Sequence, residues 1–137
     1  MHLKALCTLA AAAFVLSACN KSETPAEVQH DVATAQAEGQ RDVADARSDA
    51  KEANADADKN VADAIADNDA DDVADQAHDA NETAEKGSAK IRVAQAEADH
   101  KVAVEKCEAL TDAAQKECKD DADTRLEQVK EATKANR

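Results

Sequence analysis

The chain has 137 residues, of which 30 are Asp or Glu and 17 are Lys or Arg, so its formal net charge is −13 at pH 7. Beyond Cys19 only 13 residues are Val, Ile, Leu or Phe, and none is Trp or Tyr. Burial of so few large apolar side chains cannot offset the entropy of ordering a compact domain. The composition therefore excludes an enzyme with a water-excluding pocket for a small-molecule substrate, and we expect no catalytic residue, cofactor or resident metal. Its acidity also excludes nucleic-acid binding, which depends on Lys and Arg.

Residues 1–18 predict a cleavable signal peptide. Lys4 supplies a short positive region, and the apolar run from Ala5 to Leu16 is interrupted only by Thr8. A helix of about 12 residues covers roughly 18 Å, whereas the apolar core of a bilayer is about 30 Å thick. The run is therefore too short for a membrane-spanning helix and indicates export.

A short motif stands at the end of this signal peptide. It consists of Leu16, Ser17, Ala18 and Cys19. The order of a branched apolar residue, two small residues and cysteine resembles the lipobox of bacterial lipoproteins. This resemblance implies that Cys19 carries acyl chains and becomes the first residue after cleavage, and that these chains are the protein's contact with the membrane. The alternative is an ordinary secretory signal with an incidental cysteine.

The residue after Cys19 bears on localisation. In lipoproteins of this kind an aspartate at that position commonly implies retention in the inner membrane, and here the residue is Asn20. The resemblance therefore implies an anchor in the outer membrane, with the protein facing the periplasm.

Residues 19–24 predict a lipidated tether, and a helix is expected to begin directly after it. Thr24 as N-cap, Pro25 in the first helical position and Glu27 two residues later form a capping box. Alanine, which accounts for 29 residues beyond Cys19, favours extended helix because it is the best helix former. The expected fold is therefore all-α and partly disordered.

The end of this first helical segment is predicted at Gly87. Gly87 followed by Ser88 is typical of a C-terminal glycine and a new N-cap, which gives a long acidic segment at residues 25–86. Unbroken, such a helix would span roughly 90 Å. We expect at least one break, at Gly39 or in the acidic stretch of residues 68–72.

One stripe of branched apolar residues runs along this segment. Its members are Val28, Val32, Val43, Val61 and Ile65. The interval of 11 residues from Val32 to Val43 recurs from Ile91 to Val102, and it favours a straight or slightly right-handed helix. Two interpretations remain open: the stripe contacts a partner helix, as in a homo-oligomer, or it belongs to a solvated single helix.

Five aspartates form a row at i,i+4 spacing within the same segment. They are Asp63, Asp67, Asp71, Asp75 and Asp79. On one helix these like charges would repel, so the row is either a candidate cation-binding face or a solvated, fraying surface. The sequence from Asp67 does not match an EF-hand, because Asp72 stands where the loop needs glycine and His78 where it needs glutamate.

Cys107 and Cys118 are separated by ten residues. In an unbroken helix they would lie about 16 Å apart along the axis, too far for a disulfide. Thr111 and Asp112 are good N-caps and predict a bend between them, and two cysteines in the periplasm normally pair. We therefore expect a disulfide-closed helical hairpin at residues 89–135, while an intermolecular bridge or free thiols remain alternatives.

Two further resemblances bear on function. The segment around Cys107 and Cys118 resembles C-terminal tails of some uncharacterised Gram-negative envelope proteins, which imply no activity. An acylated, alanine-rich helix is similar in general plan to the small murein-type lipoproteins, although the C-terminal Arg137 differs from the lysine of their covalently attached members. The resulting prediction is a non-catalytic envelope lipoprotein with a structural or interaction role.

The alternatives to that role are a protective protein and a cation buffer. The 11-residue intervals resemble those of alanine-rich desiccation proteins, which are disordered until dried or bound. The aspartate row would be the buffering element.

Overall fold

The computed structural model describes residues 22–135, and within this range the chain folds into helices with no strand. The helices are α1 (Pro25–Asp67), α2 (Ala70–Cys107) and α3 (Asp112–Ala135). The all-α prediction is confirmed, whereas the predicted signal peptide and Cys19 lie outside the described residues.

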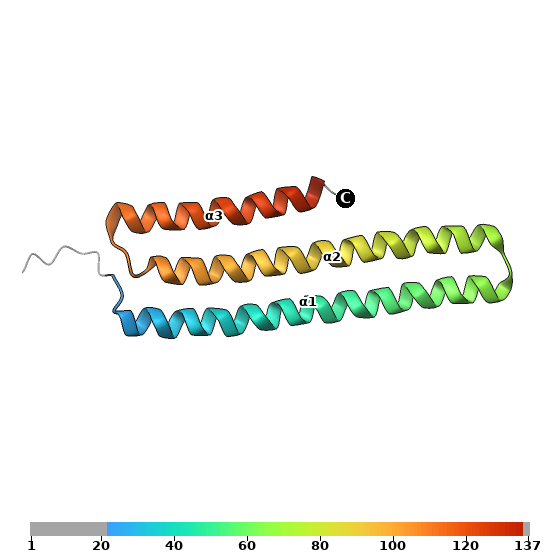
Figure 1. Ribbon diagram of the computed structural model, residues 1–137, viewed down its shortest axis with the longest axis horizontal. Helices are drawn as coiled ribbons and strands as arrows, with labels where there is room; N and C mark the ends of the chain where they lie inside the picture. The colour runs from blue at the N-terminus through green and yellow to red at the C-terminus, as the bar shows by residue number, and fades with distance from the viewer. Residues whose placement is uncertain (1–21, 136–137) are drawn as a thin grey trace, which may run out of the picture.

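The three helices lie side by side in one layer, with α2 in the middle (Figure 1). Successive helices run in opposite directions, and α2 packs against α1 along one side and against α3 along the other. Within residues 22–135, α1 and α3 do not contact each other. The middle helix therefore joins two hairpins, and both broad faces of the layer remain open to solvent.

The start of α1 confirms the predicted capping box. The backbone N–H of Glu27 donates to the Thr24 hydroxyl at 3.3 Å, and the Glu27 carboxylate accepts the backbone N–H of Thr24 at 2.9 Å. Pro25 occupies the first helical position. These bonds satisfy two donors that the first turn leaves without an intrahelical partner.

The predicted break occurs in the acidic stretch. Helix α1 ends at Asp67, and Asn68 takes a left-handed conformation with φ of 57°. Asp69 then caps α2 by accepting the backbone N–H groups of Asp71 and Asp72 at 3.1 and 3.2 Å. The continuous helix from 25 to 86 is therefore replaced by two antiparallel helices, because asparagine tolerates the αL region and aspartate is a strong N-cap.

The prediction that Gly87 ends a helix is wrong, because Gly87 lies inside α2 and is buried. Gly39 does not break α1 either. A Cβ atom on Gly39 would lie 2.5 Å from the Ala98 Cβ, and one on Gly87 would lie 3.0 Å from the Ala50 Cβ. Both glycines therefore allow close approach of α1 and α2, a role that local sequence rules do not separate from a helix end.

The 11-residue spacing follows this interface. Steps of 11 residues connect Val28, Gly39 and Ala50 on α1, and Gly87 and Ala98 on α2, and all five are buried. The partner of the predicted apolar stripe is thus α2 of the same chain. Ile65 departs from the prediction: its side chain is 60% exposed, because the interface at that level uses Ala64.

Candidate functional sites

The C-terminal hairpin confirms the predicted intrachain disulfide. Cys107 ends α2, the chain bends over residues 108–111, and Cys118 lies in the second turn of α3. The two Cα atoms are 5.7 Å apart, and Cys107 is fully buried. The bend lies where Thr111 and Asp112 predict it, and it brings together two cysteines that a straight helix would keep apart.

Noncovalent contacts also hold α3 on α2, and they include the half-buried side chains of Leu126 and Val129. Ala122 and Thr133 are its buried residues, and the remaining contacts include ion pairs near the surface. One ion pair joins Lys130 to Glu97 at 3.3 Å, and the His100 imidazole forms a hydrogen bond with Asp123 at 2.6 Å. Exposed pairs of this kind contribute little, so the disulfide adds an important constraint on α3 beside its buried contacts.

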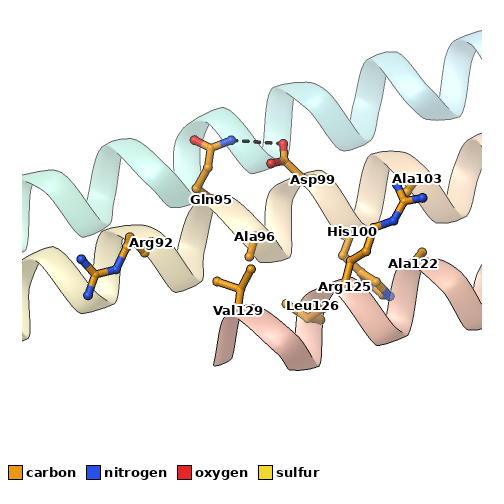
Figure 2. Close-up of a pocket in the computed structure, with 10 residues that line it drawn as sticks. All are labelled: Arg92, Gln95, Ala96, Asp99, His100, Ala103, Ala122, Arg125, Leu126 and Val129. Atoms are coloured by element: carbon orange, nitrogen blue, oxygen red, sulfur yellow. Dashed lines mark hydrogen bonds between the residues drawn. The ribbon is translucent and has the colours of Figure 1, made fainter. Parts of the chain in front are cut away.

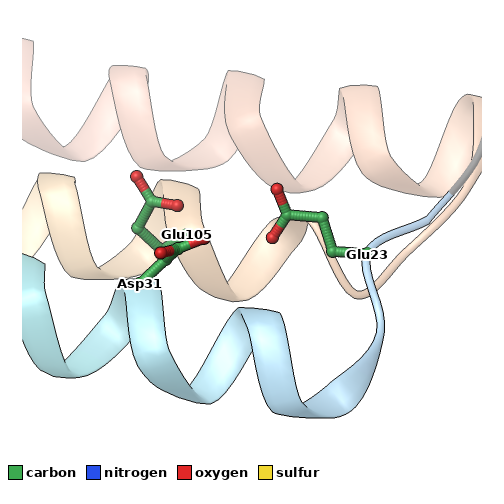
Figure 3. A group of neighbouring side chains, drawn as sticks. All are labelled: Glu23, Asp31 and Glu105. Carbon is green, nitrogen blue, oxygen red and sulfur yellow. The ribbon is translucent and has the colours of Figure 1, made fainter.

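A cluster of three carboxylates lies at the base, defined as the end of the molecule where α1 begins and the chain turns from α2 to α3 (Figure 3). Glu23 precedes α1, Asp31 lies on α1 and Glu105 on α2, and one oxygen of each lies within 4.8 Å of the others. The backbone N–H of Glu23 donates to the Glu108 carbonyl at 3.1 Å. This bond holds the segment before α1 against the α2–α3 turn.

The electrostatics of this cluster are unfavourable for Glu23. Its Oε2 atom is buried without a hydrogen-bond partner. Desolvation raises the pKa of Glu23 above its ordinary value, and the charges of Asp31, Glu108 and Glu105 add to the rise. Such a carboxyl group either takes up a proton or is stabilised in its ionised form by a hard cation such as Ca²⁺, which prefers several oxygen ligands.

Sequence reasoning missed this cluster, because its members are separated by up to 82 residues and meet only through the α1–α2 hairpin. Within residues 22–135 it is also the one group of His, Cys, Asp and Glu side chains close enough to share an ion. Only the pairing of α1 with α2 could have predicted this cluster, and the sequence did not identify that pairing.

The predicted row of five aspartates is divided by the turn at Asn68. Asp63 and Asp67 lie on α1, whereas Asp71, Asp75 and Asp79 lie on α2, and all five are exposed. The expectation of one continuous i,i+4 row is therefore wrong, because the chain reverses direction in its middle. The five carboxylates instead lie on both sides of the α1–α2 turn. We call this end of the molecule, residues 63–79, the tip.

No described helix combines the length and apolar character that crossing a membrane would need. Comparisons with protein-family models, with curated proteins and with solved structures found no match.

Proposed function

We propose that this protein is a non-catalytic lipoprotein of the outer membrane, anchored through Cys19, whose α1–α2 hairpin projects into the periplasm as an acidic arm. The segment that leads back toward Cys19 enters at the base, and the Asn68 turn lies at the opposite end of the long axis (Figure 1). The 43 residues of α1 correspond to about 65 Å of helix. An anchor at the base would therefore present the tip far from the membrane surface.

The observation that carries the proposal of an acidic arm is the distribution of charge along the α1–α2 hairpin. Residues 52–85 contain 12 acidic residues and one basic residue, a net charge of −11, whereas residues 86–135 contain 11 acidic and 10 basic residues, a net charge of −1. Residues 52–85, which lie on both sides of the α1–α2 turn, therefore carry most of the net negative charge of the chain. Such a surface favours a cationic component of the envelope as partner, since complementary charge speeds and orients association.

The anchor is tested by mass spectrometry of the protein purified from membranes. We expect a mass that corresponds to a chain beginning at Cys19 and carrying acyl groups, and release of the Cys19→Ser variant into the soluble fraction. An intact leader, or an unmodified Cys19, would overturn the proposal.

The role of the tip is tested by crosslinking in intact cells. We expect crosslinks that depend on the tip to be lost when Asp71 and Asp75 are replaced by Asn. The matched control replaces Glu117 by Gln and Asp121 by Asn, which removes two exposed charges from α3. Equal loss in both variants would show that total charge, and not the tip, determines the contact.

The alternative of a protective, disordered chain predicts different solution behaviour. A folded arm should give a cooperative loss of helical circular dichroism on heating in buffer, whereas a protective chain should become helical only in alcohol or on drying. Calcium titration followed by the same signal addresses cation buffering by the aspartates.

A further inference from the structure

A groove between α2 and α3 opens on one face of the helical layer (Figure 2). Its volume is about 440 Å³, within the range of small-ligand sites. Its floor is formed by small and branched apolar side chains from the two helices. These are Ala96, Ala103, Ala122, Leu126 and Val129.

Two arginines border this apolar floor, Arg92 on α2 and Arg125 on α3. Within residues 22–135 neither forms an ion pair with a carboxylate, although the chain carries 30 acidic residues. Asp99 also lines the groove, and its carboxylate accepts a hydrogen bond from the neutral amide of Gln95 at 3.1 Å. With Arg92, Arg125 and Asp99 in its lining and His counted as neutral, the groove has a formal net charge of +1, whereas the whole chain carries −13.

We propose that this groove binds one long-chain fatty acid. Its alkyl chain would lie along the apolar floor, and its carboxylate would pair with Arg92 or Arg125, whose guanidinium groups suit planar anions. The groove follows one seam between two helices, and this shape suits the single alkyl chain of a fatty acid better than the two chains of a phospholipid. The inference does not depend on the anchor at Cys19.

The test is calorimetric titration of dodecanoate into the full chain carrying Cys19→Ser, so that no attached acyl chain competes. We expect saturable binding of one dodecanoate per chain. Replacement of both Arg92 and Arg125 by Gln should weaken binding at least about tenfold, because charge-assisted hydrogen bonds are lost. The matched control replaces Arg41 and Arg47 by Gln; neither residue lines the groove, and we expect its affinity to be unchanged.

A second variant tests the floor without changing charge. Ala96→Leu should fill the groove and weaken dodecanoate binding, whereas Ala37→Leu on the exposed surface of α1 should not. Thermal melts of all variants show whether they remain folded. Butyrate, with the same head group and a short chain, should bind far more weakly than dodecanoate.

Four results would overturn the proposal. They are an absence of dodecanoate binding, equal binding of dodecyltrimethylammonium, an equal loss in the two arginine pairs, and binding of phosphatidylglycerol vesicles without binding of dodecanoate. The last result would make the basic groove a membrane-contact surface.

Discussion

At the scale of single residues, Gly39 shows most directly how the distance between two helices can decide which residue a position tolerates. Alanine is the better helix former by about 1 kcal/mol, so helix propensity alone would favour a substitution. At Gly39, however, a Cβ atom would lie 2.5 Å from the Ala98 Cβ and 3.1 Å from the Ala98 Cα. Relief of that overlap requires the backbones of α1 and α2 to separate.

We expect Gly39→Ala to destabilise the protein by up to about 2 kcal/mol, because overpacking costs about 1–3 kcal/mol and the gain in helix propensity offsets about 1 kcal/mol of it. Urea denaturation followed by circular dichroism measures this change. Adding Ala98→Gly to the same chain should restore space and recover part of the loss, giving a coupling energy in the double-mutant cycle. Purely additive effects would contradict a direct contact between the two positions.

Glu23 provides the second prediction at this scale. Its pKa is raised in the folded state, so the ionised form is disfavoured there, and this unfavourable contribution grows as pH rises through the folded pKa. Glu23→Gln should therefore raise the melting temperature at neutral pH. The difference from the wild type should shrink as pH falls through the folded pKa of Glu23 and vanish below about pH 4, where this carboxyl is protonated in both the folded and the unfolded state. Glu52→Gln, on the exposed surface of α1, serves as control.

At the scale of secondary-structure elements, the ends of the helices were largely predictable and their pairing was not. The capping box at Thr24 is a local motif, and local motifs appear in the sequence as they do in the structure. Gly87 satisfied the local rule for a helix end equally well, but its contact with Ala50 lies outside any local window. The base cluster was missed for the same reason.

The turn at Asn68 should depend on the left-handed conformation of that residue. Asn68→Gly should leave stability unchanged or slightly raise it, whereas Asn68→Val should lower it by about 1–2 kcal/mol, because a branched side chain is disfavoured at φ of 57°. Thermal unfolding of the two variants provides the measurement. Equal melting temperatures would show that the tip frays in solution.

The disulfide should determine whether α3 stays on α2. Replacing Cys107 and Cys118 by Ser removes a crosslink that closes a loop of about a dozen residues, worth roughly 3 kcal/mol in the chain-entropy model. We expect hydrogen exchange in α3 to accelerate strongly, while amides in the centre of α1 remain protected, since α1 and α3 do not touch. Uniform loss of protection in all three helices would show that the molecule unfolds as one unit.

At the scale of the whole molecule, the concentration of negative charge at the tip should make stability depend on salt. Raising NaCl from about 10 mM to about 150 mM shortens the Debye length from about 30 to about 8 Å and screens repulsion among the tip carboxylates. We expect the melting temperature to rise over this range, and to rise less when Asp71, Asp75 and Asp79 are replaced by Asn. A melting temperature independent of salt would contradict net repulsion at the tip.

The amino-acid sequence alone determined the all-helical class, the cap at Thr24, the bend between Cys107 and Cys118, and the concentration of acidic residues at 52–85, because each depends on residues near one another in the chain. Only the tertiary structure decided that Gly39 and Gly87 are contact points, and that Arg92 and Arg125 border one groove. Those features arise where α1, α2 and α3 pack against one another. That packing depends on contacts between residues that are far apart in the sequence.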